Sequence, residues 1–259
     1  MIVPGFNHRF PKEGSDDYLW SYADCQDRAS PLIESCCTTL DEARAAQSRG
    51  AGRIELCVDL AGGGFTPPRD LIRDVVAALT IPVNVLIRPQ AWEVSSGAGR
   101  FGDCYQSTAQ APMDFAADVF VYDEAELQQM IEDIAYCKSV GVAGIVVGAL
   151  TPVGAIDQPA MRRLIAAARP LPVTFHRAFD VCAENPFLAI DELIALGCAR
   201  LLTSGQASNA WEGRELIQKM VQYADGQLII LAGKGVTPDN LAALAAATGA
   251  KEFHGTRLP

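Results

Sequence analysis

Apolar and polar segments alternate along most of this chain with a regular spacing. Short apolar runs recur, and between them lie longer segments in which apolar residues return every three to four positions, as on one face of a helix. The alternation begins at Leu32, and each unit is roughly 20–35 residues long, which is typical of βα repeats around a parallel sheet. A strand followed by a helix is therefore the expected building unit.

The apolar runs predict eight strands, and helix-start signals predict seven helices between them. Thr39 and Glu42, for example, have the spacing of a capping box, and Gly50 ends the helix that they begin. The expected strands are 32–36, 53–57, 83–87, 144–147, 173–175, 200–203, 228–231 and 251–254. The expected helices begin near Leu40, Pro67, Asp123, Pro159, Pro186, Asn209 and Pro238.

Eight such units favour a closed α/β barrel over an open doubly wound sheet. The fold class predicted is therefore a single (β/α)8 barrel of the TIM type over residues 32–259, in which the last helix is missing. Residues 1–31 have no sustained periodicity and are interpreted as an N-terminal extension. Residues 90–121, rich in Gly, Ser and Ala, interrupt the rhythm and are interpreted as insertions.

Composition narrows the classes of partner. The chain has 259 residues and a formal net charge of -10, so its surface repels phosphate backbones, and nucleic acid is not expected as the main partner. No apolar run is long enough to span a membrane, and residues 1–30 do not form a signal peptide, which favours the cytoplasm. The 8 cysteines have irregular spacing, and we expect reduced thiols rather than a disulfide framework.

Polar side chains gather where the predicted strands end. In a parallel barrel all carboxyl ends of the strands meet at one rim, and residues two apart on a strand share a face. The strongest cluster follows residues 173–175, where an imidazole, a guanidinium and a carboxylate stand within five residues. The candidates at this rim are Glu34, Cys36, Glu55, Cys57, Arg88, His176, Arg177, Asp180, Ser204, Gly233, Lys234 and His254.

Three kinds of chemistry compete for these side chains. Cys36 and Cys57 could bind Cu(I) or zinc, with His176 or His254 as a further ligand. The alternative is that both are simply buried thiols, since the chain lacks the CxxC and HxxxH spacings of common metal sites. Each interpretation accounts for cysteines in apolar strands.

The carboxylates support a second interpretation. Glu34 and Glu55 could form an acid and base pair, and His176 and Asp180 are the other catalytic candidates. The alternative is structural ion pairing with Arg88 or Arg177.

Anion binding is the third interpretation. Gly233 and Lys234 follow the seventh strand, where barrels often bind phosphate, and Arg88, Arg177, Ser204 and His254 complete the candidate substrate and anion site. The alternative is that the glycines only form turns. Ser204 is not expected to be a nucleophile, because no His and Asp pattern accompanies it.

Several motifs, in order and at barrel spacing, give the chain a family resemblance. They are Arg-Ile-Glu-Leu-Cys at 53–57, Gly-Gly-Gly-Phe-Thr-Pro at 62–67, Ile-Arg-Pro at 87–89, the block 172–180, Leu-Thr-Ser-Gly at 202–205 and Glu-Phe-His-Gly at 252–255. Together they resemble the CutC family of copper homeostasis proteins over about residues 32–255.

The resemblance implies a TIM-type barrel, a cytoplasmic homo-oligomer and a role in copper tolerance or trafficking, with Cys36 and Cys57 as Cu(I) ligands. It implies no established reaction. The chain departs from the family pattern at Gln90, where an arginine is usual, at residues 102–105, which look displaced by an insertion, and after the eighth strand, where a family segment is absent.

Three functions remain open from the sequence. The first is a copper homeostasis protein that binds Cu(I). The second is a barrel enzyme, a metal-assisted hydrolase or lyase, that acts on a small polar substrate of phosphorylated or sugar-like character; a divalent metal would assist it. The third is a scaffold without catalysis that descends from a barrel enzyme.

Overall fold

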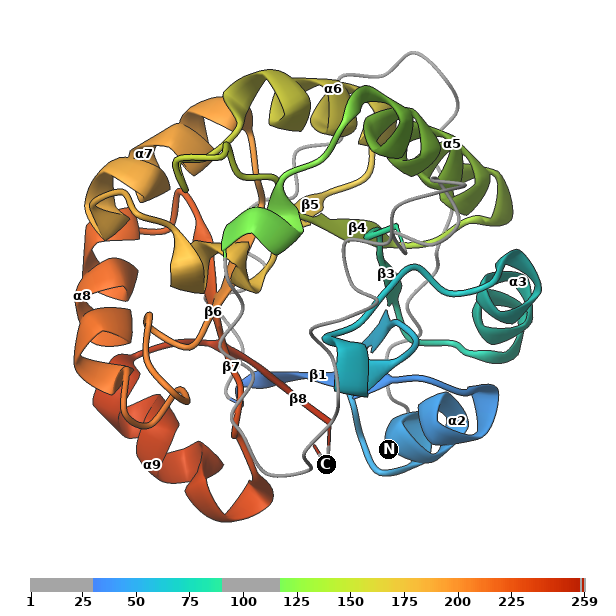
Figure 1. Ribbon diagram of the computed structural model, residues 1–259. Coiled ribbons are helices and arrows are strands. Elements are labelled where there is room, and N and C mark those ends of the chain that lie inside the picture. The colour runs from blue at the N-terminus through green and yellow to red at the C-terminus, as the bar shows by residue number, and fades with distance from the viewer. Residues whose placement is uncertain (1–29, 90–116, 257, 259) are drawn as a thin grey trace.

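The computed structural model describes residues 30–89, 117–256 and 258. Within them, eight parallel strands close into a barrel in sequence order, with β8 paired to β1, and Figure 1 looks down its axis. The predicted TIM-type (β/α)8 fold is confirmed. The strands are β1 (Leu32–Cys37), β2 (Arg53–Leu56), β3 (Val83–Leu86), β4 (Gly144–Val147), β5 (Val173–Phe175), β6 (Arg200–Thr203), β7 (Ile229–Gly233) and β8 (Glu252–Gly255).

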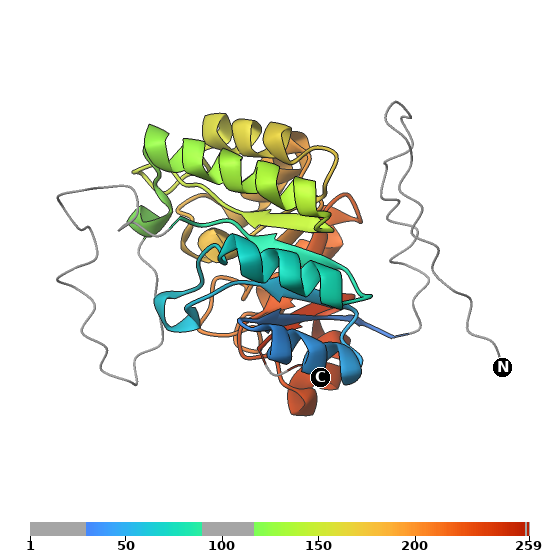
Figure 2. The same cartoon turned by 90° about the vertical axis from the view of Figure 1, so that its right-hand side faces the viewer.

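Helices form the outer ring, and Figure 2 shows several of them from the side, along the barrel wall. The α-helices among the described residues are α2 (Leu40–Ser48), α3 (Arg69–Ala78), α5 (Glu124–Val140), α6 (Gln158–Ala168), α7 (Pro186–Leu196), α8 (Arg214–Ala224) and α9 (Pro238–Thr248). Three 3-10 helices, η1 (Leu60–Gly62), η2 (Ala117–Phe120) and η3 (Arg177–Val181), lie in loops that follow strands or precede a helix. None of the described helices is both long and apolar enough to cross a bilayer.

The helix ends follow the capping chemistry that the sequence contains. The Thr39 side chain accepts a hydrogen bond from the backbone N–H of Glu42, and Asp123 and Glu126 form a reciprocal capping box at the start of α5. Gly141 and Gly197 end α5 and α7 in the left-handed conformation, which costs glycine little. Local signals therefore fix most helix boundaries.

One predicted boundary is wrong by five residues (209 against 214), whereas the other boundaries differ by two residues at most. The helix expected from Asn209 begins only at Arg214, because the preceding residues form a turn. The Asn209 side chain accepts hydrogen bonds from the N–H groups of Trp211 and Glu212, so this residue stabilises a turn of its own. The predicted extension 1–31 and insertions 90–121 fall almost wholly outside the described residues; only 30–31 and 117–121 lie within them.

Strand side chains alternate between the inside of the barrel and the layer under the helices. Ile54 and Leu56 of β2 are fully buried and belong to the large apolar core that helices and strands share. Arg53 and Glu55, one position away, belong to the opposite, inner face. Cys36, Cys57, Leu86 and Val146 form a separate small apolar cluster, in keeping with a position inside the barrel.

An ionic layer occupies the barrel interior at the level of the amino-terminal half of the strands. Arg53 forms ion pairs with Glu34 and Glu252, and Arg200 Nε lies 2.9 Å from Glu252 Oε2. All four side chains are at most 4% exposed. Burial opposes ionisation of Glu252, but the attraction of Arg53 and Arg200 outweighs it and lowers the pKa of Glu252 from 4.5 to about 2. Glu252 therefore stays charged between the two arginines.

Candidate functional site

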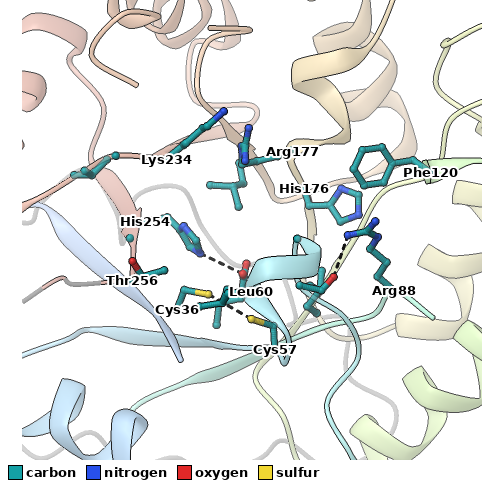
Figure 3. A pocket seen from close by; sticks show the side chains of 18 of the residues that line it. Cys36, Cys57, Leu60, Arg88, Phe120, His176, Arg177, Lys234, His254 and Thr256 are labelled. Atoms are coloured by element: carbon teal, nitrogen blue, oxygen red, sulfur yellow. Dashed lines mark hydrogen bonds and ion pairs between the residues drawn. The ribbon is translucent and has the colours of Figure 1, made fainter. Parts of the chain in front are cut away.

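A cavity of about 460 Å³ opens among side chains that follow the carboxyl ends of the strands (Figure 3). That volume suits a small molecule. The cavity lies above the ionic layer, because its lining residues stand one or two pleats further along the same strands. The structure brings eight of the predicted site residues to its wall: Cys36, Glu55, Cys57, Arg88, His176, Arg177, Lys234 and His254.

Two thiols face each other on one side of this cavity. Cys36 is the last but one residue of β1 and Cys57 directly follows β2, and their Sγ atoms lie 3.5 Å apart (Figure 3). The hydrogen bond with Cys57, together with burial, raises the pKa of Cys36 well above its ordinary value. Both groups are free thiols, and Cys36 is a neutral thiol at physiological pH.

Glu55 and His254 form the second pair in the cavity. His254 Nε2 lies 3.2 Å from Glu55 Oε1, and both residues are at most 9% exposed. Burial opposes ionisation of both groups, but their mutual attraction outweighs it, so that the pKa of Glu55 is lowered and the pKa of His254 is raised. The pair is therefore a buried carboxylate and imidazolium that hold each other in place.

His176 has the opposite character. Its Nδ1 accepts a hydrogen bond from the N–H of Ala178 at 3.2 Å, and its ring lies 5.0 Å from the ring of Phe120 between centroids. Burial, and next the charge of Arg88, lower the pKa of His176 to about 3. The ring is therefore neutral at every physiological pH, and its proton resides on Nε2.

Arg88 is positioned by the loop after β2. Its Nη1 donates to the carbonyl of Gly64 at 3.1 Å, and its guanidinium carbon lies 4.7 Å from the ring centroid of Phe65 and 5.2 Å from that of Phe120. Gly64 has φ of +87°, a conformation that suits glycine. The glycine-rich loop thus places a buried cation beside His176 (Figure 3).

Two further cations come from the loops after β5 and β7. Arg177 begins η3, and its Nε lies 2.9 Å from Asp180 Oδ2. Lys234 has φ of +71°, a left-handed conformation that is unfavourable for a side chain with a Cβ. The loop holds it there, since the carbonyl of Lys234 accepts from Ala210 N–H and Asn240 Nδ2 donates to the carbonyl of Gly235.

Four predicted site residues stand outside the described wall of the cavity. Glu34 lies in the ionic layer, bonded to Arg53 and, at 3.2 Å, to Asn84. Gly233 ends β7 against Leu202 and His254, where a Cβ would meet Leu202 at 2.5 Å. The other two are Asp180 and Ser204.

Asp180 and Ser204 belong to a hydrogen-bond network that connects two loops at the rim. The Asp180 carboxylate accepts from the Ser204 N–H at 3.0 Å, from the Ser204 hydroxyl at 3.0 Å and from the Gln206 N–H at 3.2 Å. Thr203 also donates to it, and Arg177 pairs with it. Asp180 therefore joins the loop after β6 to η3 and orients Arg177 through their ion pair.

Sequence reasoning missed several residues of the wall. Phe120 lies at the end of a segment without periodicity, so no signal pointed to it. Leu60 and Gly64 were present in the glycine-rich loop that the sequence singled out, and the rule that loops after strands form the rim could have found them. Thr256 directly follows β8 and obeys the same rule.

Cys36, Glu55 and His254 are the described residues that could share a metal ion. Their ligand atoms all lie within 4.8 Å of one another, and each residue is buried. One sulfur, one carboxylate oxygen and one imidazole nitrogen form a donor set compatible with zinc or copper.

The fold and this site define a class: a (β/α)8 barrel protein with a ligand-sized cavity at the carboxyl ends of its strands, where titratable side chains stand among apolar ones. The sequence profile of the CutC family matches residues 31–100 and 113–258, and the chain belongs to this family. Residues 101–112, inside the predicted insertions, are not covered by that match.

Individual relatives agree with the assignment. The chain is 45% identical over 224 residues to a family protein CutC of Parabacteroides distasonis, covering 86% of this chain and 81% of the relative. It is 41% identical over 222 residues to a family protein CutC of Histophilus somni. The crystal structure of a CutC protein from Streptococcus agalactiae, provisionally named for copper homeostasis, superposes with a TM-score of 0.75 at 32% identity, covering 88% of this chain and 100% of that one.

Proposed function

We propose that this protein handles copper in the cytoplasm and that Cys36 and Cys57 bind Cu(I) as its cargo. The observation that supports the proposal best is the 3.5 Å separation of the two Sγ atoms in a ligand-sized cavity. Soft thiolate sulfur favours Cu(I) over the hard cations. Copper homeostasis in the name of the Streptococcus agalactiae relative agrees with this assignment.

The separation of the thiols also suggests the coordination. Two metal–sulfur bonds of about 2.3 Å that start from atoms 3.5 Å apart enclose an angle of roughly 100° at the metal. A bent pair leaves room for a third ligand, and Glu55 and His254 have ligand atoms within 4.8 Å of the Cys36 sulfur. We therefore expect a three-coordinate ion rather than a linear one.

The surroundings suit a soft ion that must be kept from water and oxygen. Leu86 and Val146 pack with the two cysteines as one apolar cluster, and each of the four is at most 6% exposed. Binding releases the thiol protons, since thiolate is the ligand form. A reducing cytoplasm maintains such thiols.

A Cu(I) competition titration tests the proposal. Under anaerobic conditions the wild type should take one Cu(I) per chain from a chromogenic chelator, and the C36S/C57S double variant should bind at least about 100-fold more weakly, as expected when two soft ligands are lost. Cys37→Ser is the matched control, because Cys37 belongs to the apolar core shared with the helices rather than to the interior cluster. Equal Cu(I) affinity of the double variant and the wild type would show that Cys36 and Cys57 are not the Cu(I) ligands.

A second candidate function is an enzyme that acts on a small polar substrate with an anionic group. It is favoured by acid and base groups beyond those that a two-thiol site needs: the Glu55–His254 pair and the neutral His176 line the same cavity as Arg177 and Lys234. A pair of titratable groups held in opposite states is typical of proton-transfer sites.

A thermal-shift screen with small phosphorylated compounds tests this second function. Binding to the folded state raises the melting temperature, and Lys234→Ala should lower the shift that a phosphorylated ligand produces. Lys251→Ala is the matched control, because Lys251 is exposed and directly precedes β8. If every compound stabilises both variants and the wild type equally, the anionic-substrate function is wrong.

A further inference from the structure

Two buried polar atoms in the cavity lack a hydrogen-bond partner among the described residues. They are Nε2 of His176 and Oε2 of Glu55. His176 is 6% exposed and Glu55 is 5% exposed, and both side chains line the cavity. A buried donor or acceptor without a partner is costly, so its persistence points to a ligand that supplies the partner.

His176 is built to donate rather than to exchange protons with solvent. The N–H of Ala178 occupies Nδ1, so that Nε2 carries the hydrogen and directs it away from that backbone contact. Gly148 makes room for the ring, because a Cβ at this position would lie 2.6 Å from its Cε1 and Nδ1. The position directly after β4 therefore requires glycine, and the ring lies beside Arg88 (Figure 3).

Glu55 has the complementary construction. Its Oε1 is engaged by His254 at 3.2 Å, and the Cys36 thiol also interacts with the carboxylate, so that the group is fixed. Oε2 is buried and has no hydrogen-bond partner among the described residues. One oxygen anchored and one available is the arrangement of a positioned general base. The fixed neutral donor and the positioned carboxylate thus come from β5 and β2 to one cavity.

The far wall suits a phosphate group. Gly255, the last residue of β8, lines the cavity together with Lys234, Gly235 and Thr256. The latter three belong to the loops after β7 and β8, the usual location of phosphate in barrels of this type. Gly235 has φ of +73° and follows Lys234 in the same left-handed conformation, which shapes a tight backbone turn around the lysine.

We propose that the cavity binds a short phosphorylated hydroxy-carbonyl compound and that Glu55 and His176 isomerise or deprotonate it at the carbon beside the carbonyl. The inference rests on the second candidate function and names its substrate class and reaction. The phosphate lies against Lys234 and the loops after β7 and β8, and the carbonyl oxygen accepts from Nε2 of His176.

The proposed step balances without an added oxidant or reductant. Glu55 Oε2 takes the proton from the carbon, and the C–H electron pair becomes the C=C bond of an enediolate. The carbonyl π pair moves to oxygen, where the His176 N–H and the Arg88 charge stabilise it. Return of the proton to the neighbouring carbon, with transfer of the hydroxyl proton to the first oxygen, gives the isomeric carbonyl compound.

Solvent exchange tests the proton transfer directly. The copper-free protein is incubated in D2O with dihydroxyacetone phosphate, ribulose 5-phosphate or glyceraldehyde 3-phosphate, and loss of the C–H signal is followed by proton NMR. The wild type should exchange at least one of the three. Glu55→Gln should be at least about 100-fold slower, the usual contribution of a general base, while the surface variant Glu124→Gln should match the wild type.

Binding of 2-phosphoglycolate, which resembles the enediolate, separates the inference from the function on which it rests. We expect wild-type binding to weaken about tenfold or more in His176→Ala and to recover partly in His176→Gln, whose amide can donate to the same oxygen. Binding without exchange of any of the three compounds overturns the proton transfer but leaves the anion-binding function. Absence of both binding and exchange overturns both.

Discussion

The ionic layer beneath the cavity makes a quantitative prediction about stability. Glu252 is 1% exposed and joins Arg53 to Arg200. Its pKa is lowered from 4.5 to about 2, which corresponds to about 3 kcal/mol of stabilisation at neutral pH. Glu252→Gln keeps the shape but removes the charge, so two buried guanidinium groups lose their shared counter-ion. A cost of about 3–5 kcal/mol is expected for a broken buried ion pair.

The sign of the pH dependence follows from the direction of this shift. A carboxylate whose folded pKa lies below its unfolded pKa contributes its full stabilisation above about pH 4.5. That contribution is lost as the pH falls from about 4.5 to about 2. The wild type should therefore be more stable than Glu252→Gln at pH 7, and the difference should shrink across this acidic interval.

Thermal unfolding followed by circular dichroism measures the effect. For a domain of this size about 3 kcal/mol corresponds to a midpoint lower by about 6–12 °C. Glu124→Gln is the matched control, because Glu124 pairs with Arg163 on the surface, where its side chain is 75% exposed, and little change is expected. A Glu252→Gln midpoint within 1 or 2 °C (roughly 0.5 kcal/mol) of the wild type would refute the assigned role of the ionic layer.

Three more predictions follow from single contacts. Gly148→Ala should displace the His176 ring, since its Cβ would lie 2.6 Å from ring atoms, and should weaken 2-phosphoglycolate binding measured by calorimetry; unchanged affinity would contradict the ring position. Native Cys36 should react with iodoacetamide at pH 7.5 more slowly than in unfolded protein, because its pKa is raised; peptide mass spectrometry measures both rates, and equal rates would count against the buried thiol. Asp180→Asn should lower the free energy of urea unfolding by about 2–3 kcal/mol, because hydrogen bonds to a charged carboxylate are lost. A loss below about 0.5 kcal/mol would show that the hydrogen bonds of Asp180 do not stabilise the barrel.

Most of the barrel was predictable because its signals are local. An apolar run such as Val173–Phe175 predicts a strand, and caps such as Asn185 and Gly197 predict where a helix begins and ends, each within a few residues. The exception was the start of α8. There, Asn209 binds its own turn, and a polar side chain that competes with helix formation looks the same in sequence as one that caps it.

The candidate site was predictable only at the level of the rim. Barrel closure determines that Glu55, His176 and His254 reach one cavity, and strand ends in the sequence indicate this without coordinates. Height inside the barrel is a different matter. Glu34 and Cys36 share a face of β1, but only Cys36 reaches the cavity. Glu34 stands one pleat lower, where it contacts Arg53 and Asn84 in the ionic layer.

Side-chain partners could not be predicted either. The sequence makes Asp180 a catalytic candidate, and the structure shows its carboxylate accepting hydrogen bonds from the loop after β6. The backbone N–H groups that it binds, those of Ser204 and Gln206, lie 24 and 26 positions further along the chain. No local sequence pattern specifies contacts over such a separation.

The ionic layer has a consequence for how a ligand enters and leaves the barrel; its side chains are those of Arg53, Glu34, Glu252 and Arg200. They fill the barrel below the cavity, so among the described residues the interior is closed toward the amino ends of the strands. A compound or ion that enters the cavity must leave by the opening through which it arrived. Entry and exit therefore share one rim, and any partner that brings a ligand to the cavity or removes one has to approach that rim.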